Sequence, residues 1–234
     1  MKAAILKGIN EALVFEETTA PELLENEVLV DVKASALNHR DVWIQKGQYA
    51  GLKFPIILGS DGCGTVSAVQ NTSHTNWIGK EVIMNPSLNW GSNPRVQAKD
   101  YIILGLPKNG TFAGQVAIPE RLLAEKPAHL SPEQAAALPL AGLTGFRATM
   151  KRAAVKAGET VLVTGIGGGV ALLSMQFAIA AGAQVYVSSG SDEKLEKAIA
   201  MGAKGGVNYK SENWHKELQS LSGGFDATVD SACG

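Results

Sequence analysis

Four glycines within five residues, at positions 165 and 167–169, could bind a phosphate group. The residues before them, Val161–Thr164, are typical of a buried strand, and those from Val170 onward are typical of a helix. Glycine lets the backbone turn tightly and approach a ligand closely, and free N–H groups at a helix start attract negative charge. A strand, a glycine turn and a helix in this order predict a site for a dinucleotide pyrophosphate, and a purely structural turn is the alternative.

The residues after the next predicted strand indicate which dinucleotide binds. A site for NAD has a carboxylate about 20 residues beyond the glycine turn, where it accepts hydrogen bonds from ribose hydroxyls. This position falls at Ser188, within Val187–Ser191, and no acidic residue stands there. Ser188 and Ser189 offer hydroxyl groups to a 2′-phosphate, and Lys194 offers a positive charge. The pattern favours NADPH over NADH; alternatively, Ser191 only caps the next helix and Lys194 is solvated.

The second half of the chain alternates between strands and helices, which positions these residues. Strands are expected at 160–164, 184–187, 207–209 and 227–230, and helices at 170–181, 192–201 and 212–221. This alternation predicts βαβ units and a parallel, doubly wound sheet, hence an α/β fold. Upstream, the capping box Ser131-Pro132-Glu133-Gln134 predicts a helix start, and another helix is expected over about 143–155.

The first half of the chain is rich in strand and turn signals and poor in helix signals. Strands are expected at 27–34, 64–69, 81–84 and 113–119. We therefore expect a β-rich, barrel-like domain over residues 1–125 and a dinucleotide-binding domain over residues 126–234. A complete dinucleotide fold has about six strands, and the fourth expected strand ends near the last residue. The sheet is therefore expected to be truncated, as part of a longer protein.

Composition and charge argue against several other classes of protein. Lys and Arg number 21 and Asp and Glu 22, so the net charge is −1, and we expect no nucleic-acid or membrane partner. Cys63 and Cys233 cannot build a disulfide framework, and no signal peptide follows Met1, so a cytoplasmic location is expected. The uncharged run 160–191 contains several glycines, which favours buried strands around a helix over a membrane span.

Motifs in both halves of the chain resemble those of one enzyme superfamily. They are Leu37-Asn38-His39-Arg40-Asp41-Val42-Trp43, Leu58-Gly59-Ser60-Asp61-Gly62-Cys63-Gly64-Thr65-Val66, Gly110-Thr111-Phe112-Ala113, Ala137-Leu138-Pro139-Leu140-Ala141-Gly142-Leu143-Thr144 and the glycine turn. Together they resemble the medium-chain dehydrogenases/reductases, specifically the zinc-independent quinone oxidoreductase branch and its zinc-type alcohol dehydrogenase-like relatives. The resemblance covers the whole chain. It implies a GroES-like N-terminal domain, a Rossmann NADP-binding domain and a homodimer of the full-length protein.

The resemblance also implies roles for individual residues. Asn38 and Thr144 would be the catalytic pair, facing the nicotinamide and its ribose, with Asp41 and Asp61 behind them. The cofactor-binding residues would be Gly168, Gly169, Val170 and Ala171 at the pyrophosphate, Ser188, Ser189, Lys194 and Tyr209 around the 2′-phosphate, and Ser231 near the cofactor. For Tyr209, ordinary strand packing is the alternative.

Zinc is not expected to take part. The positions that match the zinc ligands of zinc-dependent relatives hold Asn38, Ser60-Asp61 and Leu140. Zinc prefers nitrogen and sulfur ligands, three of them from the protein in a catalytic site, and this set supplies none of these. We therefore expect hydride transfer from NADPH to a small-molecule quinone or α,β-unsaturated carbonyl, because such acceptors carry an electrophilic carbon and need no Lewis acid. The alternatives are a zinc-type alcohol dehydrogenase and a non-enzymatic NADPH-binding protein.

Overall fold

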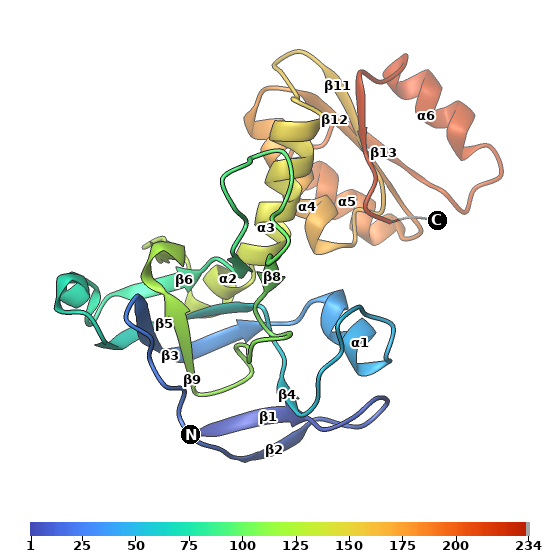
Figure 1. The fold of residues 1–234 in the computed structure, drawn as a ribbon. Helices are drawn as coiled ribbons and strands as arrows, with labels where there is room; N and C mark the ends of the chain where they lie inside the picture. The colour runs from blue at the N-terminus through green and yellow to red at the C-terminus, as the bar shows by residue number, and fades with distance from the viewer. Residues whose placement is uncertain (233–234) are drawn as a thin grey trace. The chain divides into compact units, whose positions relative to one another are not determined.

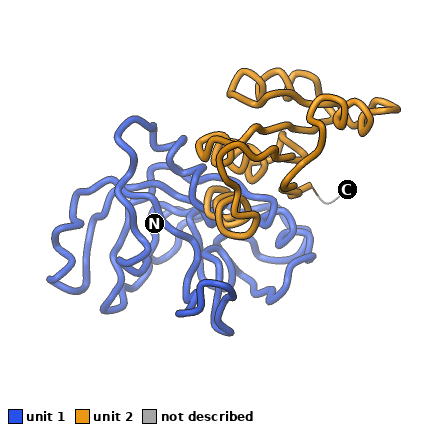
Figure 2. The backbone as a smooth tube through the Cα atoms, turned by 90° about the horizontal axis from the view of Figure 1, so that it is seen from above, with its two compact units in different colours: residues 1–140 blue, residues 141–234 orange. Residues whose placement is uncertain are grey.

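Residues 1–232 are described by a computed structural model, in which the chain divides into two units (Figure 2). Unit 1 is Met1–Leu140, and unit 2 begins at Ala141. Cys233 and Gly234, which belong to the expected second domain, lie outside the described residues. The domain boundary after residue 125 stays a prediction. No helix among the described residues is long and apolar enough to cross a membrane.

Unit 1 consists mainly of antiparallel strands (Figure 1). A five-stranded sheet has the order β10-β6-β5-β3-β9, and a three-stranded sheet has the order β2-β1-β4. Alternating residues of the larger sheet, including Val28, Val30, Val82 and Ile118, point into one apolar core. The strands are β1 (Lys2–Leu6), β2 (Val14–Glu17), β3 (Glu27–Ala36), β4 (Ile56–Ile57), β5 (Asp61–Val69), β6 (Glu81–Met84), β7 (Ser87–Leu88), β8 (Ile102–Ile103), β9 (Gln115–Pro119) and β10 (Leu123–Glu125).

Unit 1 also contains short helices. The helix α2 (Pro132–Ala136) begins at the predicted capping box, in which Ser131 Oγ accepts from Gln134 N at 3.3 Å and Gln134 Oε1 accepts from Ser131 N at 3.0 Å. It packs on β3 and β5. The helix α1 (His39–Gln45) was not predicted; Asn38 is its N-cap residue. Two 3₁₀ turns, η1 (Thr72–Trp77) and η2 (Glu120–Leu122), complete the unit.

Unit 2 is built around a parallel sheet of order β13-β12-β11-β14. Figure 1 shows α4 and α5 on one face of this sheet and α6 on the other, which confirms the predicted doubly wound α/β arrangement. Val161, Val163, Met175, Val185 and Val187 form the centre of its core. The elements are β11 (Thr160–Val163), α4 (Gly169–Ala180), β12 (Gln184–Ser189), α5 (Asp192–Ala200), β13 (Gly205–Asn208), α6 (Trp214–Ser222) and β14 (Ala227–Val229).

The helix expected over 143–155 differs from its prediction. The helix α3 begins four residues earlier and covers Pro139–Phe146, because proline suits the first turn of a helix. It continues into a π-helical turn, η3, over Arg147–Arg152, where Ala153 N donates to the carbonyl of Ala148 at 2.9 Å. A regular α-helix therefore occupies only the first part of the expected range.

Candidate functional site

Asp61 is the centre of a buried polar cluster in unit 1. It is the first residue of β5, and only 1% of its surface is exposed. Its Oδ2 accepts a hydrogen bond from Asn38 Nδ2 at 2.9 Å, and its Oδ1 accepts one from the backbone N–H of Leu140 at 2.7 Å. The carboxylate therefore fixes the orientation of the Asn38 side chain and ties it to the segment that contains Leu140.

Burial controls the charge of this cluster. It raises the pKa of Asp61 to about 6, although the hydrogen bonds from Asn38 and Leu140 lower it. Burial also raises the pKa of Asp41, whose Oδ2 accepts from Asn38 N at 2.9 Å and whose Oδ1 accepts from Gly59 N at 3.4 Å. Asp41 thus supports the backbone at Asn38, and Asp61 supports its amide group. Both were placed behind Asn38 in the sequence analysis.

The cluster does not fit a catalytic zinc ion. Both oxygens of Asp61 already accept from N–H groups, and the Asn38 amide nitrogen is one of the donors. Ser60 Oγ accepts from Arg40 and donates to the carbonyl of Leu104. Zinc requires a set of three nitrogen, sulfur or carboxylate ligands around one point. Among residues 1–232, no group of three or more His, Cys, Asp or Glu side chains is arranged to hold a metal ion.

The predicted glycine turn of unit 2 connects β11 to α4. Gly165 has a φ of 63°, a conformation that favours glycine, and its carbonyl accepts from Gly168 N at 3.0 Å. Gly168 is the N-cap residue of α4. The N–H groups of the next three residues, Gly169, Val170 and Ala171, belong to the first helical turn, which has no partner within a helix. The pyrophosphate residues expected from the sequence therefore lie together at a helix N-terminus.

Lys194 lies against this glycine turn. A Cβ atom added to Gly167 would stand 2.6 Å from Lys194 Nζ, so the absence of a side chain at Gly167 makes room for the ammonium group. Ser188 is also close, because its carbonyl accepts a hydrogen bond from Ile166 N at 3.0 Å. The neighbouring Ser189, like Ser188, is buried at the end of β12. The structure thus brings these three predicted residues to one end of the sheet.

Tyr209 lies next to the same end of β12. A Cβ atom on Gly190 would stand 2.7 Å from Tyr209 Oη and 3.0 Å from Lys210 Cε. Tyr209 N donates to the carbonyl of Ser189 at 3.0 Å. Lys210 is a second cation beside the predicted phosphate site, and the sequence analysis did not identify it. Lys210 directly follows the strand predicted over 207–209, and this position could have indicated that it lies near the phosphate site.

The other predicted residues of unit 2 occupy different elements. Thr144 lies in α3 and is exposed. Ser231, also exposed, follows β14, where the neighbouring Asp230 accepts from Thr164 Oγ1 at 2.6 Å. The Thr164–Asp230 pair joins the ends of β11 and β14 and was not predicted. Of the predicted catalytic pair, Asn38 belongs to unit 1 and Thr144 to unit 2.

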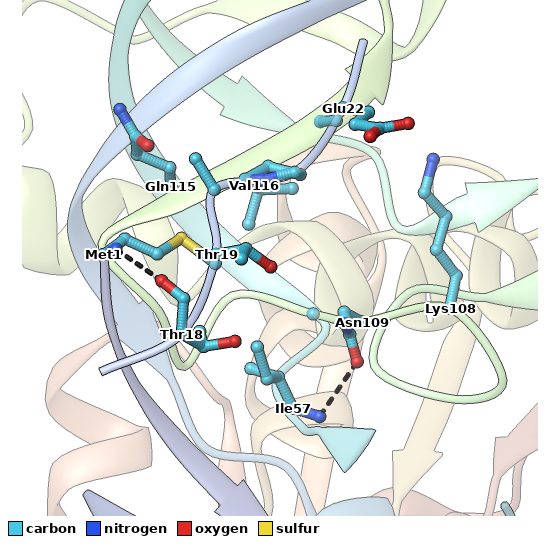
Figure 3. A pocket seen from close by; sticks show the side chains of 13 residues that line it. Met1, Thr18, Thr19, Glu22, Ile57, Lys108, Asn109, Gln115 and Val116 are labelled. Carbon is cyan, nitrogen blue, oxygen red and sulfur yellow. Dashed lines mark hydrogen bonds between the residues drawn. The ribbon is translucent and has the colours of Figure 1, made fainter. Parts of the chain in front are cut away.

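A cavity of about 490 Å³ in unit 1 lies apart from the predicted site residues. Figure 3 shows its wall, where the Met1 ammonium group donates to the carbonyl of Thr18 at 2.6 Å. In the same wall, Asn109 Oδ1 accepts from Ile57 N at 3.1 Å. None of the predicted catalytic or cofactor-binding residues is part of this wall.

Comparisons with known proteins identify the superfamily. Residues 24–128 match the alcohol dehydrogenase GroES-like domain, and residues 169–234 match the zinc-binding dehydrogenase family. The zinc-type alcohol dehydrogenase-like protein YogA of Leptosphaeria maculans is 41% identical over 89% of this chain and 63% of its own length. The chain belongs to the medium-chain dehydrogenase/reductase superfamily. The predicted GroES-like and Rossmann-type fold is thereby confirmed.

Relatives of this medium-chain dehydrogenase/reductase differ in their named activities. Quinone oxidoreductase 1 of Escherichia coli is 30% identical over 95% of this chain and 62% of its own length. A crystal structure of an NAD-dependent alcohol dehydrogenase superposes with a TM-score of 0.90 and 39% identity, over 98% of this chain and 70% of that one. The chain spans about three-fifths of the length of the curated relatives. The comparisons therefore establish the superfamily, and they leave open which hydride acceptor and which nicotinamide cofactor this chain uses.

Proposed function

We propose that this medium-chain dehydrogenase/reductase transfers a hydride from NADPH to a quinone or an α,β-unsaturated carbonyl compound without a metal ion. The observation that carries the proposal is the cluster of Ser188, Ser189 and Lys194 beside the glycine turn. Hydroxyl and ammonium groups bind phosphate well, and a carboxylate does not occupy the position that a NAD site requires. The nearest acid along the chain, Asp192, accepts a hydrogen bond from Asn208 Nδ2 at 2.8 Å.

The residues of unit 2 would hold the cofactor at three places. The N–H groups of Gly169, Val170 and Ala171 would bind the pyrophosphate, and Gly168, whose own N–H donates to Gly165, would let the backbone approach it closely. Lys194, Ser188, Ser189 and Tyr209 would bind the 2′-phosphate, with Lys210 as an additional cation, and Thr144 and Ser231 would contact the rest of the cofactor. When bound, NADPH supplies the hydride, and the protein supplies orientation and electrostatics.

Asn38 is the proposed catalytic residue of unit 1. An amide nitrogen carries two N–H groups, and one of those of Asn38 donates to Asp61. The second N–H is proposed to donate to a carbonyl oxygen of the acceptor or of the nicotinamide. A fixed hydrogen-bond donor stabilises negative charge that develops on oxygen. Asp61 is then a positioning residue, because it holds the amide without touching the reactants.

A second candidate function is the oxidation of an alcohol with NAD. It is favoured by the name of the superposable NAD-dependent alcohol dehydrogenase, although the donor set at Asn38, Asp61 and Leu140 does not fit zinc. The two functions differ in their cofactor, metal content and acceptor. Turnover with NAD and a primary alcohol, together with one equivalent of bound zinc, would replace our proposal with this one.

The test of the proposal combines cofactor binding with turnover. The full chain is expected to bind NADPH at least ten times more tightly than NADH, and Lys194→Met is expected to remove most of this difference. Lys204→Met, an exposed lysine on the neighbouring turn, is the matched control and is expected to leave the ratio unchanged. Equal affinities for the two cofactors in the unmodified chain would contradict the assignment.

Turnover is measured on a panel of quinones and enals with each cofactor. Asn38→Ala is expected to lower kcat by about 100-fold, the effect typical of losing one donor to a developing oxyanion, while NADPH affinity stays within about threefold. Tight NADPH binding without turnover of any acceptor would favour the non-enzymatic alternative.

A further inference from the structure

Arg40 is a buried cation of unit 1 that the proposed hydride transfer does not use. Only 8% of its surface is exposed, and it lies on the inner side of α1. Its Nη1 donates to Ser60 Oγ at 2.7 Å and to the carbonyl of Leu104 at 2.9 Å. Its Nε and Nη2 are buried and have no hydrogen-bond partner among the described residues. Two of the three guanidinium nitrogens are therefore left with unused N–H groups.

No carboxylate of the described chain pairs with this guanidinium group. The ion pairs found among residues 1–232 involve other cations, and Asp41 and Asp61 act on Arg40 only as neighbouring charges. Both of these carboxylates direct their oxygens to other N–H donors. Burying a charge without an oppositely charged partner destabilises the folded chain, so the presence of Arg40 calls for a compensating group.

Arg40 forms part of the wall of a cavity of about 400 Å³. The segment between residues 97 and 107 also lines this cavity, and it contributes Tyr101 and the apolar residues Ile102 and Leu106. Tyr49 is a further lining residue, and the centroid of its ring lies 5.1 Å from the guanidinium carbon of Arg40. Among residues 1–232, Arg40 is the only charged residue in this wall. The cavity therefore combines one positive charge with an aromatic and aliphatic lining.

We infer that this cavity binds a small organic monoanion, whose carboxylate pairs with Arg40 and whose apolar body packs on Tyr101 and Ile102. The unused N–H groups of Nε and Nη2 match the two oxygens of a carboxylate, the bidentate geometry that arginine favours. Because Nε and Nη2 are buried, the Tyr49 ring beside the guanidinium group would have to turn aside for the anion to reach these donors. The inference is independent of the proposed hydride transfer, because binding is measured on the chain without a cofactor.

The test compares a carboxylate with its neutral counterpart. The full chain, labelled at isoleucine methyl groups, is titrated in chloride-free buffer with benzoate and with benzamide, which have the same size and differ in charge. Benzoate is expected to shift the Ile102 and Ile103 methyl resonances with a Kd at least ten times lower than that of benzamide. Equal affinities, or no shift of these two resonances, would overturn the inference.

Three variants assign the effect to Arg40 and to the cavity. Arg40→Met is expected to weaken benzoate binding at least tenfold, whereas Arg121→Met, at an exposed arginine of η2, leaves it unchanged. Arg40 also donates hydrogen bonds to Ser60 and Leu104, so Arg40→Met could disturb the fold. Its isoleucine methyl resonances outside the cavity must therefore match those of the unmodified chain before binding is compared. If it does not fold, Ala50→Trp serves instead, since Ala50 is exposed, lines the cavity and leaves Arg40 intact. Unchanged benzoate binding in Ala50→Trp contradicts the site.

Discussion

At the scale of single residues, the balance between burial and hydrogen bonding sets the behaviour of Asp61. Two N–H donors stabilise its charged form, and burial disfavours that form more strongly, so its pKa is raised to about 6. The folded chain therefore takes up a proton between about pH 4 and pH 6 that the unfolded chain, with an ordinary aspartate pKa near 3.9, does not hold. Protonation of Asp61 thus favours the folded state at low pH, and this contribution is lost as the pH rises through 6.

We predict that Asp61→Asn removes a specific part of the pH dependence of stability. Between pH 4.5 and pH 7.5, the titration of Asp61 lowers the free energy of unfolding of the unmodified chain by about 2 kcal/mol. An asparagine cannot titrate, and its amide can accept from Leu140 N and donate to Asn38 once the Asn38 amide is turned over. Urea unfolding of the variant and of the unmodified chain at pH 4.5 and pH 7.5 measures how much of this change the variant loses.

The control for this prediction is Asp100→Asn, at an exposed position. It is expected to follow the unmodified chain at both pH values. If Asp61→Asn keeps the same slope as the unmodified chain, burial of the Asp61 charge is not the source of the pH dependence.

The sequence could identify Asn38, Asp41 and Asp61 as a group, and it could not identify the role of Arg40. The first three belong to motifs whose spacing resembles that of known enzymes. The environment of Arg40 depends on Ser60 and on the backbone carbonyl of Leu104, which is 64 residues away along the chain. A lone arginine in a helix is usually solvated, so only the tertiary structure shows that this one is buried without an acidic partner.

At the scale of elements, the close approach of β3 and β5 depends on a glycine. Gly64 of β5 is paired with Val32 of β3. A Cβ atom on Gly64 would stand 2.2 Å from the carbonyl oxygen of Asp31, which is backbone and cannot turn away. The central pair of the larger sheet therefore tolerates no side chain at this position.

We predict that Gly64→Ala destabilises the chain by about 3 kcal/mol, because the strands must separate to accept the added methyl group. Gly114→Ala is the matched control, since its added Cβ would meet no atom closer than 3.7 Å and its φ is not positive. Thermal unfolding followed by circular dichroism compares the two variants. A loss below 1 kcal/mol in Gly64→Ala would show that the sheet adjusts at this point.

A second prediction at this scale concerns the capping box of α2. Ser131→Ala removes the side-chain acceptor for Gln134 N and is expected to cost about 1 kcal/mol of stability. The helix presents Ala135 and Ala136 to the buried Cys63, so fraying of its first turn would loosen this small core. Ser92→Ala, in an exposed loop, is expected to change the unfolding free energy by less than 0.5 kcal/mol. Equal losses in the two variants would contradict the capping role.

The sequence predicted the strands and helices of unit 2 better than those of unit 1. In unit 2, glycines and capping residues separate strands from helices, and the elements from β11 onward begin within two residues of their predicted positions, whereas α3 begins four residues early. In unit 1, the strands β1 and β2 were missed, and so was the seven-residue helix α1. The strand β1 is held by pairing with residues far along the chain, such as Ile5 with Ile57, and not by a pattern in its own residues.

At the scale of the whole molecule, the two units carry different parts of the proposed chemistry. The near-neutral charge of −1 gives no general attraction for anions, so binding of a nucleotide must come from a local arrangement of groups. In unit 2, the side chains proposed to bind the 2′-phosphate form such an arrangement; they include Lys194, Tyr209 and Lys210. A ligand that binds them only in the folded state must also stabilise that state.

We predict that adenosine 2′,5′-bisphosphate, which carries both phosphate positions and no nicotinamide, stabilises unit 2. At 100 times its Kd it is expected to raise the free energy of unfolding by about 2.7 kcal/mol. Trp214 is in unit 2, whereas Trp43, Trp77 and Trp90 are in unit 1, so ¹⁹F resonances of 5-fluorotryptophan follow the two units separately during heating. Adenosine 5′-monophosphate lacks the 2′-phosphate and cannot use Lys194. At the same concentration as the bisphosphate, it is therefore expected to raise the midpoint temperature of the Trp214 transition less. Equal shifts with the two nucleotides would place the selectivity for NADPH outside these residues.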